Sequence, residues 1–327
     1  IEGWLLDLYT HPRHGQTCLW MIEQGGKRTC FYHAFPGIFY FTGSNPVQLQ
    51  RAENFLYEKF SEIAQVKREY IWQSVTPTEQ PIYAVHTENP NALWKVFRPF
   101  SQNFPDLDFY NVDLDVSHYY AAQCGLFAFC QMTVEVDERN HIQTIRVKDS
   151  AWEMDIEDPP LRILKLSPNH NPRAQLPTVL KLSIGERSVR LPYASNEMLA
   201  RKVSPYLHQY DPDIILTDYG DGYLMQALED GSKDWVEPLP LNRDLTAPLK
   251  LIKERSYHSY GQMFYRPQSV LLYGRQHIDM QGSFFYKDSQ LIGVLEVARV
   301  TAQSLQRTAR TTPGTGISSM QIVEALR

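Results

Sequence analysis

A chain of 327 residues with 43% hydrophobic and 12% aromatic residues is long enough to bury a core and too apolar to be disordered. Its 32 Lys and Arg residues against 37 Asp and Glu give a net charge of -5, which excludes a general basic attraction to nucleic acid. Four cysteines without a C-x-x-C pair predict reduced thiols without structural zinc, and no apolar run approaches the roughly 20 residues of a membrane helix.

The first segments are predicted to form an antiparallel meander. Three apolar runs, at residues 4–9, 17–22 and 29–35, are separated by turn residues such as Gly25 and Gly26, which favour a hairpin. A helix is predicted to begin at Asn45 and Pro46, because Asn caps a first turn and Pro suits the first helical position. Its apolar stripe comprises Leu49, Ala52, Phe55, Leu56, Phe60 and Ile63.

The next stretch predicts a second set of strands around a short helix. The expected elements are strands at 70–75 and 82–86, a helix at 90–100 and a strand at 109–115. On that last strand Asp113 and Asp115 would share one face. They are either a solvent-facing side of a half-buried strand or a pair of oxygen ligands for a hard cation.

A polar hairpin and a linker close the first half of the chain. Residues 132–136 and 142–147 alternate between apolar and polar around the turn at 137–140. The acidic segment 155–160 ends in two prolines, which predicts a linker and a domain boundary.

The second half begins with three strands and a helix. Strands are expected at 161–167, 179–184 and 186–191, a helix at 197–206 and a short apolar strand at 214–217. Three antiparallel strands, a helix and a strand ending in acidic residues is the order of a ribonuclease-H-like fold. Asp218 and Asp221 follow the last strand, where ligands gather in α/β sheets.

Two groups of side chains are candidate sites. Asp218, Asp221 and Asp279 either converge as a rearranged metal site or serve as turn residues. Arg299, Arg307 and Arg310 lie near several hydroxyl residues in the most basic local run, which either contacts phosphates or forms a solvated helix end. Residues 317–326 are expected to form a terminal helix.

Four stretches, in the same order along the chain, together resemble the amino-terminal and exonuclease regions of family B DNA polymerases. They are residues 3–7, 89–127, 211–215 and 296–315. The resemblance implies an α/β (α+β) protein: an amino-terminal mixed α/β domain on an antiparallel meander at 1–158, and a ribonuclease-H-like exonuclease-type domain with a mixed sheet at 159–287. Residues 288–327 would be a return segment leading toward the palm.

The resemblance also implies that the nuclease site is degenerate. The family holds two divalent metals with carboxylates, whereas the corresponding positions here carry Lys165 and Ser167, and Leu224 stands where a further acid belongs. A lysine repels a cation and a serine cannot balance its charge. No catalytic residue and no metal are therefore expected in this chain.

The functional expectation is the amino-terminal and exonuclease-like part of a DNA-directed DNA polymerase, or of a polymerase-like protein, without proofreading. It would contribute scaffolding and template or single-strand binding in replication or repair, with DNA, nucleotide and repair or replication proteins as partners in the nucleoid-containing cytoplasm. The chain alone is expected to be inactive, with polymerase activity residing downstream of Arg327. The alternatives are an active 3′–5′ exonuclease that uses Mg²⁺ or Mn²⁺ with relocated carboxylates, and a protein-interaction module without nucleic-acid binding.

Overall fold

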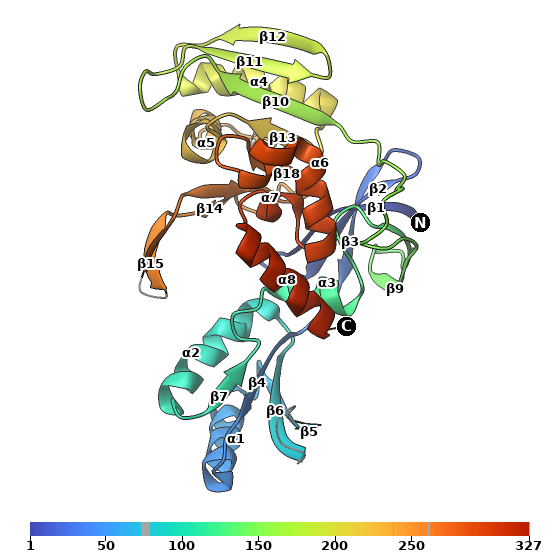
Figure 1. Cartoon of the computed structure of the whole chain (residues 1–327), viewed down its shortest axis with the longest axis vertical. Coiled ribbons are helices and arrows are strands. Elements are labelled where there is room, and N and C mark those ends of the chain that lie inside the picture. The colour runs from blue at the N-terminus through green and yellow to red at the C-terminus, as the bar shows by residue number, and fades with distance from the viewer. Residues whose placement is uncertain (73–78, 238, 260–261, 327) are drawn as a thin grey trace. The chain divides into compact units, whose positions relative to one another are not determined.

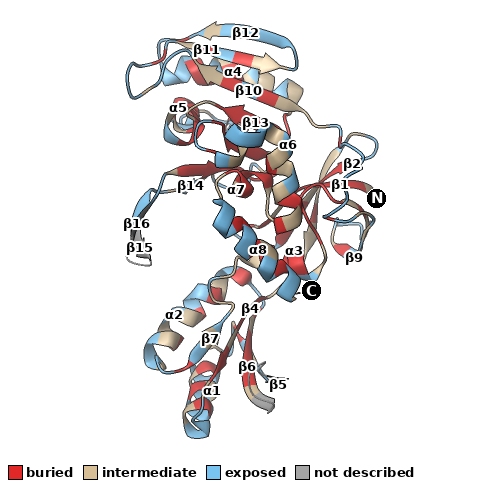
Figure 2. Cartoon of the chain, in the orientation of Figure 1, coloured by how far each residue is buried: buried red, intermediate tan, exposed pale blue. Residues whose placement is uncertain are grey.

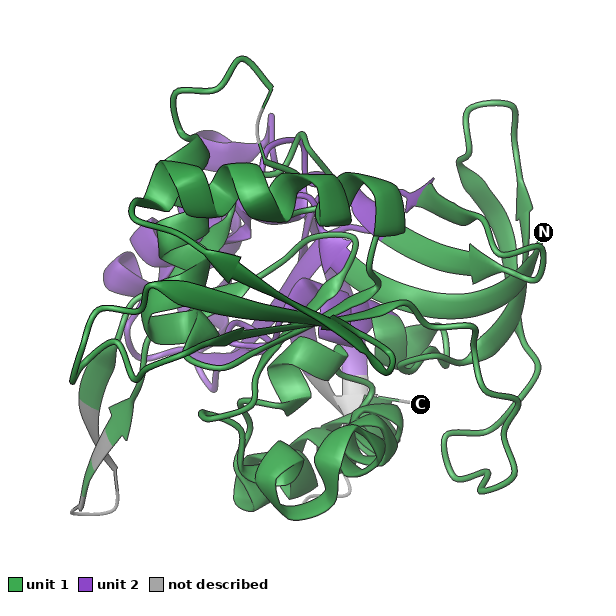
Figure 3. Cartoon of the chain, turned by 90° about the horizontal axis from the view of Figure 1, so that it is seen from above, with its two compact units in different colours: residues 1–8, 19–31, 121–327 green, residues 9–18, 32–120 purple. Residues whose placement is uncertain are grey.

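The chain forms two compact units in the computed structural model, which describes residues 1–72, 79–237, 239–259 and 262–326 (Figure 1). Unit 1 comprises residues 1–8, 19–31 and 121–327, and unit 2 comprises residues 9–18 and 32–120 (Figure 3). These contact-based units do not follow the expected boundaries at 158 and 287. The division into three domains stays a prediction.

Unit 2 contains a four-stranded sheet, two α-helices that pack against it and a short 3₁₀ helix. The apolar stripe predicted from helical spacing is confirmed: Leu49, Ala52 and Leu56 are buried against Phe39 and Phe41 of the sheet. Asn45 caps the first helix as expected, since its side-chain oxygen accepts from the backbone of residues 47 and 48. The elements are the strands β5 (Gln65–Trp72), β6 (Glu79–Thr87), β4 (Gly37–Thr42) and β7 (Asp108–Tyr110), in that order, and the helices α1 (Pro46–Phe60), η1 (Pro90–Ala92) and α2 (Leu93–Asn103). The predicted strand at 70–75 is described only to residue 72, and the rest of it lies outside the described residues.

The expected strand at 109–115 is confirmed only at residues 109 and 110, and its acidic part is wrong. Strand β7 ends at Tyr110, and Asp115 instead precedes helix α3 (Val116–Gln123). Its carboxylate accepts from the backbone nitrogens of Ser117 at 3.0 Å and His118 at 3.4 Å. Asp115 therefore caps a helix, because its side chain satisfies amide groups that have no partner in the first turn. The two aspartates do not share a strand face.

The predicted meander and polar hairpin form one five-stranded sheet. Its order is β3 (Arg28–His33), β2 (Thr17–Glu23), β1 (Glu2–Thr10), β8 (Gln131–Val136) and β9 (Ile142–Val147). The last two strands pair antiparallel around the predicted turn. Residues 159–162, at the end of the predicted linker, form no helix or strand.

A second, mixed sheet confirms the fold class expected for the second half. Its order is β12 (Arg187–Pro192), β11 (Val179–Ile184), β10 (Ile163–Pro168), β13 (Ile214–Thr217) and β18 (Gln276–Asp279). The first three strands are antiparallel, whereas β13 runs parallel to both β10 and β18. Helix α4 (Asn196–Tyr210) provides the crossover from β12 to β13, and the Ser195 side chain caps it by accepting from the nitrogen of Met198 at 3.2 Å.

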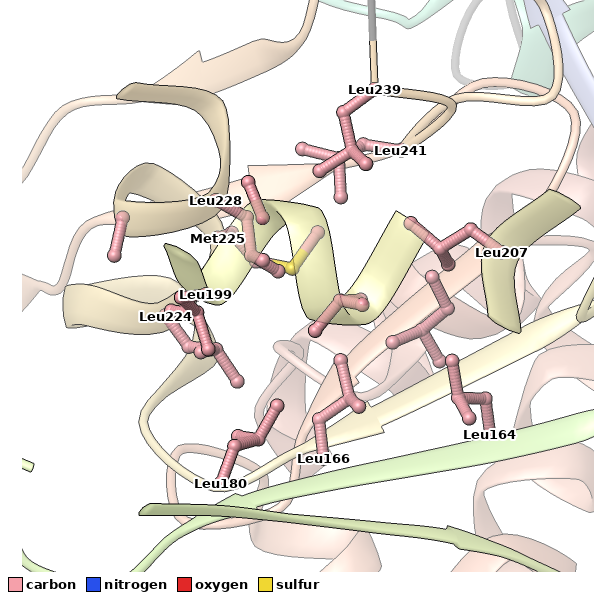
Figure 4. Packing of buried hydrophobic residues seen from close by; sticks show 14 of the residues in the cluster. Leu164, Leu166, Leu180, Leu199, Leu207, Leu224, Met225, Leu228, Leu239 and Leu241 are labelled. Carbon is pink, nitrogen blue, oxygen red and sulfur yellow. The ribbon is translucent and has the colours of Figure 1, made fainter. Parts of the chain in front are cut away.

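Apolar side chains pack on one face of the mixed sheet and on the β13–β18 part of the other face. On one face Leu164, Leu166 and Ile215 pack against α4 and α5 (Met225–Ser232), as Figure 4 shows for part of this cluster. On the other, Leu216 and Ile278 pack against α6 (Phe284–Thr301) and α7 (Leu305–Thr308) and against residues of β1 and β2. Alternation of side chains along each strand produces this division.

Two elements of the carboxyl-terminal part were predicted incompletely. Helix α8 (Pro313–Leu326) contains the predicted helix at 317–326 and begins four residues earlier. Two short ribbons were not predicted: β14 (Lys250–Ile252) with β17 (Ser269–Leu271), and β15 (Arg255–Ser259) with β16 (Gln262–Arg266). Among the described residues no helix has both the length and the apolar character of a membrane span.

Buried ion pairs anchor the turn before β13. Asp213 is fully buried and accepts from Arg28 at 2.6 and 3.0 Å, from Arg243 at 3.0 Å and from the backbone of Arg162 at 2.8 Å. Burial opposes ionisation, yet these donors hold the pKa of Asp213 below its ordinary value. Asp211, which ends α4 with a positive φ of 45°, contacts Arg243 and Arg275 at 3.0 Å each. The acidic turn thus joins the strand β3 to the mixed sheet.

Candidate functional site

The candidate site lies where the parallel strands β13 and β18 end. Thr217 and Asp279 are cross-strand partners in the last pair of this ladder. The chain then turns at Tyr219, with a φ of 59°, into a π-helical turn, Gly220–Leu224. A Cβ at Gly220 would lie 1.9 Å from Thr217 Oγ1, so the turn requires glycine. This geometry places Asp218 and Asp221 beyond the carboxyl end of β13, as predicted.

Asp221 forms a bidentate ion pair with Arg310. The guanidinium donates from Nε to Asp221 Oδ2 at 2.8 Å and from Nη2 to Oδ1 at 2.7 Å, and the amide of Val270 donates to Oδ1 at 2.8 Å. Arg310 also donates from Nη1 to the carbonyls of His277 at 2.9 Å and Gln306 at 2.7 Å. Burial raises the pKa of Asp221, but Arg310 and His277 outweigh it and keep the pKa low. The charge of this carboxylate is therefore balanced within the protein.

His277 is a buried neutral residue beside this ion pair. Burial is the main cause that lowers its pKa to about 4, with Arg310 adding to it and Asp221 opposing it. Its Nδ1 lies 2.7 Å from the carbonyl of Val270 and its Nε2 lies 2.9 Å from Thr217 Oγ1. A proton on Nδ1 suits the Val270 carbonyl, with the Thr217 hydroxyl donating to Nε2, whereas the donor Arg310 Nη2, also 3.0 Å from Nδ1, favours the opposite tautomer. His277 thus supports the ion pair structurally.

The other two aspartates at this edge also have partners within the protein. Asp279 accepts from the amides of Asp221 and Gln281, at 3.0 Å each, and burial raises its pKa. Asp218 accepts from Gln281 Nε2 at 3.0 Å. The structure therefore brings the three predicted aspartates to one edge of the sheet. No group of three potential metal ligands occurs among the described residues.

The three positions predicted to replace metal-binding acids differ in their surroundings. Lys165 is exposed on β10, and Ser167 is half-buried two residues further along the same face. Leu224 is fully buried in the apolar cluster with Leu164 and Leu199. A carboxylate pair is absent from β10, and the surroundings of Leu224 are those of a core leucine. The donor set therefore does not fit two divalent metals.

Two of the three predicted DNA-binding arginines are used inside the protein. Arg299 is buried, donates to Asp149 at 3.0 Å and to the carbonyl of Ser150 at 2.7 Å, and lies over the ring of Phe127 at 4.7 Å. Arg310 is held by Asp221. Several of their donors are engaged by protein acceptors, although Arg299 Nε has none, so phosphate contact by these two arginines stays a prediction. Arg307 is half-buried, and the positive charge of its guanidinium lowers the pKa of Asp7; its role in DNA binding stays a prediction.

A pocket of about 440 Å³ opens at the same edge of the sheet. Its lining includes the Asp221–Arg310 pair, aromatic side chains and two further arginines that sequence reasoning missed. These two, Arg173 and Arg266, are exposed. They come from the β10–β11 loop and the β16 ribbon, which are distant in sequence and give no local signal. The aromatic members are Tyr219, Tyr223 and Tyr265.

Asp7 is a buried carboxyl that connects the first sheet to β18. Its oxygens accept from the amide of Gly274 at 2.8 Å and from Gln276 Nε2 at 2.9 Å. Burial raises its pKa from 3.8 to about 7, although these donors and Arg307 oppose the shift. An acid with a raised pKa binds its proton more tightly in the folded state. Its contribution to stability is therefore present at low pH and is lost as pH rises toward 7.

Substituting Asp7→Asn is expected to remove this pH dependence. The difference in unfolding free energy between wild type and variant should shift in favour of the variant as pH rises from about 4 to about 7, by up to about 4 kcal/mol. Urea unfolding at several pH values measures this difference. A difference that stays constant with pH would contradict the assignment.

Comparison with known proteins supports the fold. No protein-family model matches the chain, and no curated protein matches it in sequence. Among solved structures, the family B DNA polymerase from the hyperthermophilic archaeon Pyrobaculum calidifontis is similar, with a TM-score of 0.70 and 15% sequence identity. The match covers 99% of this chain and 50% of that polymerase, so the chain spans half its length. The chain therefore shares a mixed α/β fold with part of that polymerase.

Proposed function

We propose that this chain is the amino-terminal and exonuclease-like part of a DNA polymerase-like protein, that it binds single-stranded DNA and that it does not cleave it. The observation that carries the proposal is the combination of a polymerase-related fold with an Asp221–Arg310 ion pair at the end of β13. In this arrangement Arg310 is paired with Asp221, one of the three carboxylates that a rearranged metal site would use. Polymerisation would belong to a further part of such a protein.

The chemistry of the β10 face supports the absence of cleavage. Two-metal hydrolysis needs carboxylates that neutralise both ions and hold them a few ångströms apart. Lys165 and Ser167 supply one positive charge and one hydroxyl in place of two negative charges. The electrostatic cost of placing two divalent cations there is not offset by any neighbouring acid on that strand.

The pocket supports strand binding. Aromatic rings bind bases by stacking, and Arg173 and Arg266 offer guanidinium groups for phosphates without sequence preference. Asp221 does not oppose this, because its charge is paired with Arg310. The same proposal includes contact with DNA, a role in replication or repair, and binding to replication or repair proteins.

Incubating the purified chain with a labelled single-stranded oligonucleotide and Mg²⁺ or Mn²⁺ is expected to leave the oligonucleotide intact while a binding assay detects a salt-sensitive complex. Substituting Arg173→Gln and Arg266→Gln together should weaken that complex. The double variant Arg51→Gln/Lys59→Gln, on exposed positions of α1, changes the net charge equally and serves as the control.

Two outcomes would change the assignment. Metal-dependent shortening that is lost in Asp218→Asn would establish the exonuclease with relocated carboxylates. Intact DNA without any measurable complex would instead favour a protein-interaction module that kept the fold.

A further inference from the structure

The strands β10, β11 and β12 carry a local excess of positive charge. Their 18 described residues contain four basic side chains and no Asp or Glu, in a chain whose net charge is -5. The basic residues are Lys165, Lys181, Arg187 and Arg190. Such an imbalance over three adjacent strands is unusual for a surface that only needs to be solvated, where both signs normally alternate.

The sheet register places three of these cations on one face. Cross-strand partners share a face, and the two rows across the strands are Lys165–Ser183–Ser188 and Ser167–Lys181–Arg190. The alternate residues, including Leu164, Leu166 and Leu182, are buried against α4 and α5. The rows with Lys165, Lys181 and Arg190 therefore belong to the opposite face, which we call the basic face.

The basic face is accessible. Lys165, Lys181, Ser188 and Arg190 are exposed, and Ser167 and Ser183 are half-buried. Figure 2 shows β12 as mostly exposed along its length. The ion pairs found among the described residues include none of the three cations.

The arrangement of charges is unfavourable unless an anion is present. Lys181 and Arg190 are direct cross-strand partners, and like charges in that position destabilise a sheet. Lys165 lies diagonally from Lys181, at a typical separation of about 7–8 Å. Three cations in close succession, with hydroxyl donors between them, suit a run of phosphates better than a single small anion.

We propose that the basic face binds the phosphodiester backbone of single-stranded DNA. The three strands span about 10 Å from β10 to β12, a strip suited to one backbone. Serine hydroxyls would donate to phosphate oxygens between the cations, so that contact is independent of base sequence. This inference rests on the proposed function for its ligand but uses side chains that do not line the pocket.

The test compares double variants of the full chain by titration with a labelled thymidine oligonucleotide at several salt concentrations. In Lys181→Gln/Arg190→Gln, loss of two phosphate contacts should lower the slope of log affinity against log salt by about 1.4. The affinity ratio of wild type to variant should then shrink about sevenfold between roughly 50 and 200 mM salt. Arg51→Gln/Lys59→Gln on α1 is the charge-matched control and should change neither quantity by as much.

The stability of the same variants gives a second readout. Because the substitution removes a like-charge pair, Lys181→Gln/Arg190→Gln should unfold at a temperature no lower than that of the wild type. A weaker complex would then not reflect loss of the fold.

The outcomes separate this inference from the proposed function. If the wild type binds DNA and the basic-face variant behaves like the control, the basic face is wrong and strand binding by the pocket stands. If the wild type binds no DNA, both fail. If duplex DNA is bound more tightly than single strands at the same salt concentration and through the same residues, the assignment to single strands is overturned.

Discussion

Substituting Asp213→Ala should lower the free energy of unfolding by about 3–5 kcal/mol, because it leaves the buried Arg28 without its counter-charge and removes one of the two carboxylates that pair with Arg243. Asp213 is fully buried and accepts from Arg28, from Arg243 and from the backbone of Arg162. Equilibrium urea unfolding of wild type and variant at pH 7 measures the change. The pKa of this carboxyl is lowered, so its stabilising contribution is lost as pH falls below its ordinary value of 3.8.

A surface ion pair provides the control for this prediction. Glu197 and Arg201 are four residues apart on α4, at 2.8 Å, and both side chains are largely exposed. Glu197→Ala should cost at most about 1 kcal/mol. If Asp213→Ala cost no more than Glu197→Ala, the buried network would not be the anchor of the turn before β13.

Removing Arg310 should be nearly as harmful, with a loss of about 3–5 kcal/mol in Arg310→Ala. The substitution leaves the Asp221 carboxylate buried without its cation and removes donors from the carbonyls of His277 and Gln306. The pKa of Asp221 should then rise, because burial is the largest influence on it and Arg310 the main opposing one. The contribution of Asp221 to the stability of the variant should consequently be larger at acidic pH than at pH 7. In the wild type, where the pKa of Asp221 is lowered, this contribution falls at acidic pH instead.

A double-mutant cycle isolates the Asp221–Arg310 interaction. The loss in Asp221→Ala/Arg310→Ala should be smaller than the sum of the single losses by roughly 0.5–3 kcal/mol, because neither residue is then left as an unpaired buried charge. Additive losses would show that the two side chains are independent. Chemical denaturation of all four proteins under one buffer condition provides the comparison.

The predictions that succeeded depend on local sequence. Asn45 followed by Pro46 is a local signal for a capped helix start, which α1 confirms. The helical spacing of Leu49, Ala52 and Leu56 places them in one buried stripe. The apolar run before Asp218 similarly predicts a short buried strand, which β13 confirms. In contrast, the aromatic and acidic run at 109–115 suits a strand by pattern but forms a helix cap, because Asp115 satisfies the amides of α3.

The candidate site was only partly predictable, because some of its residues come together from distant parts of the chain. Asp218 and Asp221 could be placed at the end of a strand, since the carboxyl end of a buried strand is visible as a change from apolar to polar residues. The partner of Asp221 could not be predicted, because Arg310 is 89 residues away in the sequence. Nothing in the local sequence distinguishes Arg310 from the other arginines of this basic run. Arg173 and Arg266 could not be predicted for the same reason, because they line the pocket from the β10–β11 loop and from β16, which are far apart in the sequence.

By itself the sequence determined the periodic elements and the order of strands that predicts a mixed sheet, and it carries Lys165 and Ser167 where the resemblance to family B DNA polymerases implies acids. Only the tertiary structure decided which charges meet: Arg310 with Asp221, Arg28 and Arg243 with Asp213, and Lys181 opposite Arg190. Local patterns depend on residues within a few positions of one another. Charge pairing depends on distances in space, which the strand register and the packing of helices set across the whole chain.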